Sequence, residues 1–246
     1  MTAVFTDDVV DVADVDELPD EYRELLVHQM LANGEGELSA GDTYVESFYP
    51  LAPNADERYK CLQFGMEEVD HFRRFARLLE DLRVDTSYII QQAKSERRYF
   101  PAESMNTKFI HWEERAAFSF LCELEGHFQI NELAASTYAP LRHEAGIILK
   151  EEARHFGYGK RLMRNAFDEG GPARDRAQEA LTRFYPMTLD MFGRSASRRG
   201  RDAVRWGLRQ HDNGELRELY KTEIAQHIEG IGYKVPKDDP RRRQFA

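Results

Sequence analysis

Disulfide bonds and membrane-spanning segments are not expected in this sequence. Its 246 residues include only two cysteines, Cys61 and Cys122, which are too few for a disulfide framework. We interpret both as buried, reduced thiols, as in the cytoplasm. No apolar run reaches the roughly 18 residues that a membrane span needs. The acidic N-terminus also lacks the basic and apolar regions of a secretory signal. We therefore expect a cytoplasmic protein without membrane contact.

Basic residues are also outnumbered, with 34 lysines and arginines against 44 aspartates and glutamates. The net charge is −10, and a chain of that sign repels phosphate backbones, which argues against general nucleic-acid binding. Arginines nevertheless gather at one place, at positions 194, 198, 199, 201, 205 and 209. Two interpretations are open for this cluster: a clamp for phosphate groups, which the guanidinium fork suits, or a solvated helix face.

Proline and glycine are scarce inside the long periodic segments and cluster between them, which favours helices over many short strands. Apolar residues recur at helical spacing, and we expect an all-α domain at 19–235. An acidic, flexible tail at 1–18 precedes it, and a flexible tail at 236–246 follows. The expected helices cover about 19–49, 54–82, 106–137, 139–170, 173–192 (bent or split at Pro186), 197–211 and 214–230, with an irregular crossing at 83–105.

Two helices in this plan carry the same motif, Glu68-x-x-His71 and Glu152-x-x-His155. Residues three apart share one helix face, so each pair can bind a single metal ion. Both pairs lie on the apolar stripe of their helix, where an unpartnered carboxylate costs several kcal/mol. Two such motifs, with one further glutamate from each of two more helices, form the ligand set of ferritin-like dimetal bundles.

The two further glutamates are Glu37 and Glu123. Glu37 precedes Glu68 by 31 residues and Glu123 precedes Glu152 by 29, so each helix pair repeats the same layout. Glu35 and Glu125 are close alternatives for these two positions. We therefore predict a ferritin-like four-helix bundle with a dimetal carboxylate site and additional C-terminal helices. Oxygen and imidazole ligands suit two iron ions, or manganese or mixed ions, with O₂ as co-substrate.

Each motif is preceded by a second acid, Glu67 or Glu151. An adjacent residue points about 100° away round the helix. It could therefore reach the histidine of the other helix and fix its tautomer. A solvated surface position is the alternative. Gly34 and Gly36, beside Glu37, mark either a close approach of another helix or a break in the first helix.

The motifs together resemble the catalytic subunit of bacterial phenylacetyl-CoA epoxidase over about residues 18–235. The resemblance rests on Leu18-Pro19-Asp20-Glu21-Tyr22-Arg23, Glu68-x-x-His71, Ser136-Thr137-Tyr138-Ala139-Pro140 and Lys150-Glu151-Glu152-Ala153-Arg154-His155. It implies a di-iron monooxygenase that epoxidises or hydroxylates an acyl-CoA thioester such as phenylacetyl-CoA. It also implies two partners, an external reductase and a homologous non-catalytic subunit. The chain is shorter than the catalytic subunit of that family, and residues 83–110 depart from its pattern.

The expected metal ligands are thus Glu37, Glu68, His71, Glu123, Glu152 and His155, and catalysis would act through the metals they hold. The alternative function is a stand-alone ferritin-like oxidase, either a ferroxidase or an oxidase of a non-CoA substrate. A compact monomer or homodimer would argue against an iron-storage cage.

Overall fold

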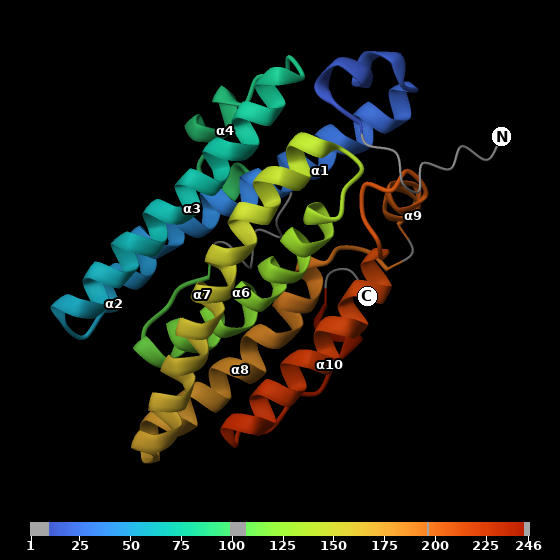
Figure 1. Ribbon diagram of the computed structural model, residues 1–246. Coiled ribbons are helices and arrows are strands. Elements are labelled where there is room, and N and C mark those ends of the chain that lie inside the picture. Colours follow the sequence, from blue (N-terminus) through green and yellow to red (C-terminus); the bar gives the residue numbers. More distant parts are fainter. Residues whose placement is uncertain (1–9, 99–106, 196, 244–246) are drawn as a thin grey trace.

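The computed structural model describes residues 10–98, 107–195 and 197–243 (Figure 1). Four long helices form a bundle of two pairs. α1 (Asp20–Thr43) packs on α3 (Ala55–Asp81), and α6 (Trp112–Ala134) packs on α7 (Ala139–Glu169). The expected all-α bundle is therefore confirmed, with the two pairs facing each other across its centre.

Three more helices follow the bundle in sequence. α8 (Gly171–Met191) packs on α6 and α7, α10 (Asn213–Ile231) lies beside α8, and α9 (Arg198–Arg205) contacts α1 (Figure 1). Short helical segments make up the rest: η1 (Val12–Glu17), η2 (Tyr44–Phe48), α2 (Tyr49–Leu51), α4 (Ser87–Gln91), η3 (Lys94–Glu96) and η4 (Pro240–Arg242). These elements supply the expected C-terminal helices, of which α8 and α10 cover the α6–α7 pair.

Local signals explain most helix ends. The Asn54 side chain accepts a hydrogen bond from the Glu57 backbone N–H at the start of α3, and α7 ends at Gly170, whose φ is +73°. Two expectations need correction. The helix expected at 106–137 spans Trp112–Ala134, and the one expected at 197–211 ends at Arg205, before a turn at Gly207 with φ of +66°. α8 runs as one helix through Pro186.

The first long helix does not break at its glycines. A Cβ added at Gly34 would lie 3.2 Å from Phe75 Cβ, so glycine here permits close packing of α1 on α3. α1 then passes into η2, a π-helical turn, and into α2. A π-turn holds one extra residue and is frequent at functional sites. In this chain the π-turn begins at Tyr44, whose side chain is buried.

Residues 10–18, expected within a flexible tail, pack on the bundle. Val10 and Val15 are buried, and the Val10 N–H donates to Thr137 O while its carbonyl accepts from Ala139 N–H. At the other end, Pro236 is buried and η4 follows. The physical reason is long-range: these apolar side chains find partners in the turn between α6 and α7 and against α8. The remaining tail residues, 1–9 and 244–246, lie outside the described residues.

Among the described residues, no helix combines the length and apolar character needed to cross a membrane. Both cysteines are free; Cys61 is buried, whereas Cys122 is only partly buried because it lines the cavity described below.

Candidate metal centre

Side chains from all four bundle helices meet at the centre of the molecule. α1 contributes Glu37, α3 contributes Glu68 and His71, α6 contributes Glu123, and α7 contributes Glu152 and His155. They form two overlapping sets whose donor atoms lie within 4.8 Å of one another: Glu37, Glu68, His71 and Glu152, and Glu68, Glu123, Glu152 and His155. The structure thus brings together all six residues singled out in the sequence.

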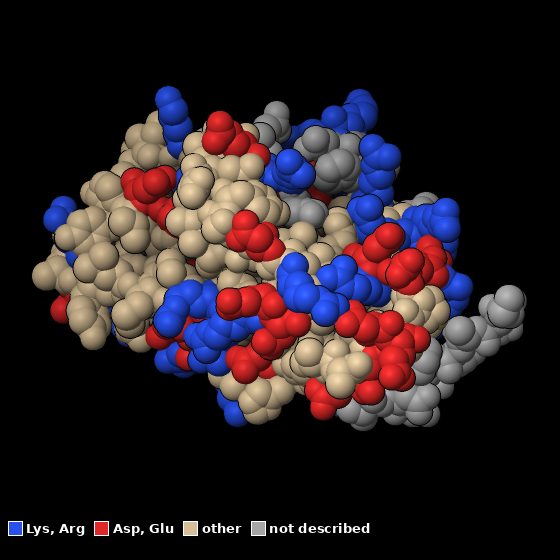
Figure 2. Space-filling model, turned by 90° about the horizontal axis from the view of Figure 1, so that it is seen from above, with Lys and Arg blue, Asp and Glu red and all other residues tan. Residues whose placement is uncertain are grey.

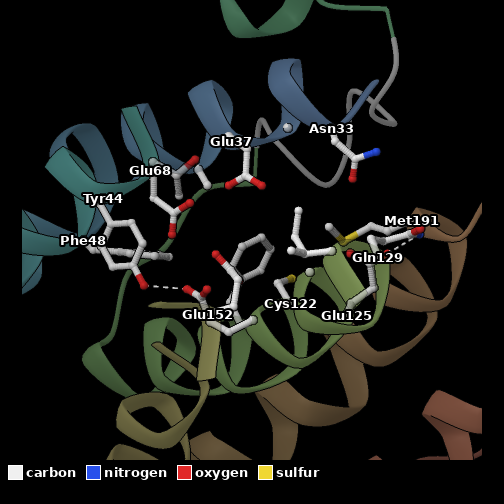
Figure 3. Close-up of a pocket in the computed structure, with 17 residues that line it drawn as sticks. Asn33, Glu37, Tyr44, Phe48, Glu68, Cys122, Glu125, Gln129, Glu152 and Met191 are labelled. Atoms are coloured by element: carbon white, nitrogen blue, oxygen red, sulfur yellow. Dashed lines mark hydrogen bonds between the residues drawn. The ribbon is translucent and has the colours of Figure 1, made fainter. Parts of the chain in front are cut away.

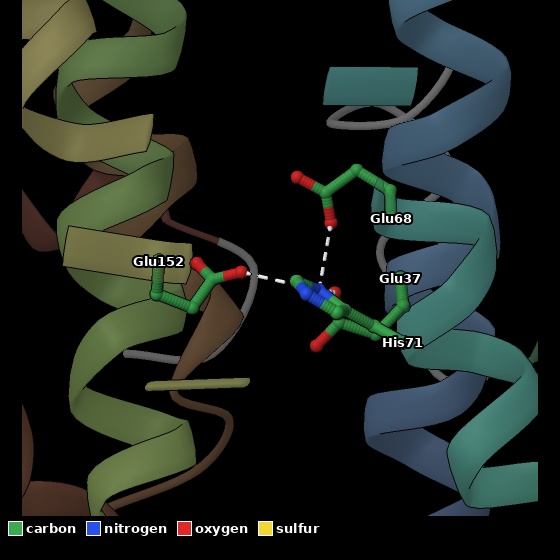
Figure 4. Close-up of side chains that lie close together, drawn as sticks. All are labelled: Glu37, Glu68, His71 and Glu152. Carbon is green, nitrogen blue, oxygen red and sulfur yellow. Dashed lines mark hydrogen bonds and ion pairs between the residues drawn. The ribbon is translucent and has the colours of Figure 1, made fainter. Parts of the chain in front are cut away.

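Glu68 and Glu152 belong to both sets, and they face each other from opposite helix pairs. In Figure 4 dashed lines join the His71 ring to Glu68 on α3 and to Glu152 on α7. Glu152 has the room it needs because α6 carries Gly126 opposite it; a Cβ there would lie 3.2 Å from Glu152 Oε2. Carboxylates shared in this way can bridge two ions.

Each histidine is held at both ring nitrogens. Nδ1 points inward: that of His71 lies 3.2 Å from Glu37 Oε2, and that of His155 lies 2.9 Å from Glu68 Oε1. Nε2 points outward, toward Glu151 Oε2 at 2.9 Å for His71 and toward Glu67 Oε2 at 2.7 Å for His155. The two outer acids therefore reach the histidine of the opposite helix, as expected, and their surface role is excluded. A carboxylate at Nε2 favours the tautomer whose Nδ1 can bind metal.

Without metal, the cluster holds protons. Burial opposes protonation of His71, but hydrogen bonds and charge from Glu37 and Glu68 outweigh it and raise its pKa to about 12. Burial, and then the neighbouring carboxylates, raise the pKa of Glu152 well above its usual range. Metal ions would have to displace these protons, so their binding should be coupled to proton release.

The donor set fits a dimetal centre. Four carboxylates and two imidazoles offset most of the charge of two ions, and oxygen and imidazole are the ligands that iron and manganese accept. Glu152 Oε1 is buried and makes no hydrogen bond within the described part of the chain; it lies 3.4 Å from His71 Nδ1. Buried polar atoms of this kind are costly unless something binds them, and metal ions would do so.

The two alternative glutamates lie elsewhere. Glu35 is fully buried but belongs to neither donor set. Glu125 faces a cavity beside the centre, where burial raises its pKa to about 8. The structure therefore favours Glu37 and Glu123 as ligands, and the assignment of ligands stays a prediction.

Tyr44 and Arg115 adjoin the centre and were missed in the sequence. Tyr44 OH donates to Glu123 Oε1 at 2.5 Å, from the π-turn that ends α1. Arg115 is fully buried behind it, with its guanidinium carbon 5.0–5.6 Å from the ring centroids of Tyr44, Phe48, Trp112 and Tyr158. Tyr44 is seven residues from Glu37, two helical turns along the same stripe, and that spacing could have marked it.

A cavity opens on one side of the centre (Figure 3). Glu37, Glu68 and Glu152 point toward it, and Cys122, Glu125, Gln129 and Met191 line its other side. Much of the remaining wall is apolar, with Phe48, Phe118 and Ile130. An outer recess adjoins the cavity, since Asn33, Glu125, Gln129 and Met191 line both.

The chain has identifiable relatives. It is 24% identical over 229 residues to one subunit of the 1,2-phenylacetyl-CoA epoxidase of Escherichia coli (strain K12), covering 91% of this chain and 72% of that protein. It is 26% identical over 211 residues to benzoyl-CoA oxygenase component B of Aromatoleum evansii, covering 74% of this chain and 43% of that protein. Both belong to oxygenases, so the expectation of an oxidoreductase is confirmed.

The fold has a solved counterpart. A Synechococcus protein with aldehyde deformylating oxidase activity superposes with a TM-score of 0.62 at 17% identity, covering 88% of this chain and 93% of the other. This likeness confirms the ferritin-like fold. The family model for the phenylacetic acid catabolic protein matches residues 1–244. This chain, whose two donor sets share Glu68 and Glu152 inside a four-helix bundle, therefore belongs to the phenylacetic acid catabolic protein family.

Proposed function

We propose that this protein is a di-iron monooxygenase that uses O₂ to epoxidise or hydroxylate an aromatic or other acyl-CoA thioester, such as phenylacetyl-CoA. The observation that carries the proposal is the complete pair of donor sets sharing Glu68 and Glu152. The activities named for the two relatives support the substrate class. When bound, two iron ions (or manganese or mixed ions) would supply the electrons that activate O₂.

The chain's own residues would position the centre. Glu37, Glu68, Glu123 and Glu152 would hold the ions with His71 and His155, and Glu67 and Glu151 would keep both imidazoles in the binding tautomer. Tyr44 would fix the orientation of the Glu123 carboxylate through its hydrogen bond. Its ring also helps to close the cavity around the carboxylates.

The cavity would hold the part of the substrate that reacts. Phe48, Phe118 and Ile130 supply apolar contacts and exclude water, which limits side reactions of an activated oxidant. Ferroxidases need no such apolar chamber, so the cavity favours an organic substrate over iron oxidation alone.

The outer recess would hold the charged end of the substrate. Arg194, Arg199 and Arg209 line it, three of the six arginines clustered in the sequence. Arg199 contacts His28 and Arg209 donates to Asn213, both within the wall of the recess, whereas Arg205 pairs with Glu21 and Arg198 with Asp202. Arginine suits phosphate oxygens, so a CoA moiety could rest in the recess with its acyl group reaching inward past Met191.

We further infer that electrons come from an external reductase and that the protein works with a homologous non-catalytic subunit. The names of the relatives, one a subunit of an epoxidase and the other a component of an oxygenase, support a multicomponent enzyme. A cytoplasmic location would match the reduced state expected for Cys61 and Cys122.

Metal content and product mass test the proposal in turn. After anaerobic reconstitution with ferrous iron, the protein should hold about two iron ions per chain, the number expected for this ligand set. Well under one ion per chain would contradict it.

The reduced, reconstituted protein should then convert phenylacetyl-CoA to a product heavier by one oxygen atom taken from ¹⁸O₂. Free phenylacetate is the matched control and should stay unchanged. Iron oxidation without any oxygenated product would favour a stand-alone oxidase.

A further inference from the structure

We propose that the outer face of α3 is the contact surface of a homodimer, in which α3 packs antiparallel on the α3 of a second copy around a two-fold axis near Met66. This contact lies on the side of α3 opposite the metal centre and is independent of the proposed function. The fold leaves several large apolar side chains of this face in solvent.

Four large apolar side chains form a stripe on α3 at steps of three and four residues. Tyr59 is 67% exposed, Leu62 48%, Met66 68% and Val69 37%. Val45, from η2, is 49% exposed and extends the stripe sideways. Of the nine exposed large apolar side chains found in the described residues, these five lie together. Such a concentration on one face is typical of an interaction site rather than of scattered surface residues.

Close packing of α1 and α3 makes this surface continuous. A Cβ added at Gly65 would lie 3.4 Å from Val45 Cγ2, and one added at Gly41 would lie 3.0 Å from Val69 Cγ2. The two glycines therefore let the apolar side chains of neighbouring elements meet. Figure 2, a view from above Figure 1, shows uncharged side chains over much of its left part, the side on which α2 and the start of α3 lie in Figure 1.

The charges along α3 are arranged so that the face complements itself. Its exposed N-terminal end carries Asp56. Its C-terminal half carries Arg73 and Arg77, which lie 2.8 and 4.0 Å from Asp70 of the same helix but keep side chains that are 63% and 60% exposed. An antiparallel copy turned about Met66 would bring Asp56 opposite Arg77 and Tyr59 opposite Arg73. Opposite charges and an arginine on a tyrosine ring both favour this pairing.

The apolar residues follow the same symmetry. About the same axis, Met66 meets Met66 of the second copy, and Leu62 meets Val69. A surface whose two halves match in this way is the requirement for a two-fold contact between identical chains. α3 has 27 residues and is about 40 Å long, so two antiparallel copies can be in contact over several helical turns.

Solution mass tests the surface. Sedimentation equilibrium of the full chain should give twice the chain mass of 28.6 kDa. Met66→Asp would place two buried carboxylates against each other at the axis, so this variant should sediment as a monomer. The control is Leu219→Asp on α10, where the side chain is 46% exposed but lies outside the α3 face; it should stay dimeric. Circular dichroism should show the same helix content for both variants.

A charge swap tests the antiparallel register. Asp56→Lys and Arg77→Glu should each weaken the dimer at low salt, since each places like charges opposite each other. The double variant should restore it, because the swapped charges again meet across the axis. A wild-type chain that is monomeric up to its solubility limit would overturn the proposal. So would a dimer that survives Met66→Asp, or a monomer that uses this face only to bind a different protein.

Discussion

At the scale of single residues, the metal centre depends on glutamates that differ in role although they lie side by side on one helix. Glu152 faces inward into both donor sets, and Glu151 faces outward to His71 Nε2. The first would bind metal, and the second would orient a ligand. Two substitutions separate these roles.

Replacing Glu152 with alanine should abolish metal binding at one or both positions, because both donor sets lose a shared carboxylate. The helices should remain folded, since the side chain makes no hydrogen bond through its inward oxygen. Iron analysis and circular dichroism measure the two outcomes. Glu125→Ala, in the same cavity but outside the donor sets, is the control and should keep its iron. Full occupancy in Glu152→Ala would show that the ligand assignment is wrong.

Glu151→Ala should weaken metal binding without abolishing it. Loss of an outer partner of a ligating histidine typically lowers metal affinity by about 10–100-fold. Titration of apoprotein with ferrous iron or manganese measures the change. Glu144→Ala, two turns earlier on α7 and paired with Arg74, should bind metal as the wild type does. Equal affinities for the two variants would mean that the Glu151 contact to His71 has no effect.

His28 gives the protein a pH-dependent stability that is separate from the metal centre. Burial and then the charge of Arg199 lower its pKa to about 4, and Arg199 donates a hydrogen bond to its Nε2. The folded pKa is below the unfolded value of about 6.5. The stability is therefore complete above pH 6.5 and is lost as the pH falls from there toward 4.

His28→Gln should flatten this dependence by about 1–2 kcal/mol between pH 7 and pH 4, a figure reduced to allow for the partial exposure of the ring. Urea unfolding at a series of pH values measures it. His143→Gln, at an exposed position on α7, is the matched control. If His28→Gln keeps the full pH dependence, other groups cause it.

At the scale of elements, α6 and α7 approach each other closely at Gly159, because this residue has no side chain. A Cβ on Gly159 would lie 2.9 Å from Phe120 N and 3.0 Å from its Cα. Backbone atoms cannot move aside cheaply, so Gly159→Ala should lower the free energy of unfolding by about 1–3 kcal/mol.

Gly157, on the same helix, provides the control for this element. A Cβ there meets nothing within 4 Å, so Gly157→Ala should stabilise the protein by up to about 1 kcal/mol through helix propensity. Urea midpoints compare the two. A Gly159→Ala variant as stable as Gly157→Ala would show that α6 and α7 adjust to the extra methyl group.

Helices and the ligand positions within them could be predicted because they depend on local spacing. Glu68 and His71 share a face for any helix through 55–81, and the proline and glycine positions mark most helix ends. Glu67 and Glu151 were predictable for the same reason. The contact from Tyr44 to Glu123 spans 79 residues and passes through a π-turn. The spacing from Glu37 could mark Tyr44 as a neighbour of the centre, but no local pattern encodes the π-turn or names Glu123 as its partner.

The packing of residues 10–18 could not be predicted for a related reason. The acidic composition indicates a solvated segment, yet Val10 pairs with Thr137 and Ala139, more than 100 residues away, and Val15 is buried. The length of the helix expected at 197–211 was overestimated because apolar spacing continues past Arg205, whereas Gly207 ends the helix through its backbone conformation.

At the scale of the whole molecule, metal binding should stabilise the fold. Ferrous iron or manganese at about 1,000 times its dissociation constant adds about 4 kcal/mol, which for a chain of this length raises the melting temperature by roughly 8–16 °C. Anaerobic calorimetry with and without metal measures this shift. Magnesium is the control and should give a smaller change. An equal shift for Glu152→Ala would place the stabilising ions outside the centre.

The junction between the N-terminal segment and the bundle also limits when this part of the protein can fold during synthesis. Val10 pairs with Thr137 and Ala139, and Thr137 in turn donates its backbone N–H to Gly207 O. Three parts of the chain made at different moments must therefore be present before this junction closes. At 5–20 residues per second, synthesis from Val10 to Gly207 takes roughly 10–40 s. During that interval α1 and α3 are synthesised first. The face that this pair turns toward α6 and α7 stays uncovered until the second half of the polypeptide has been made.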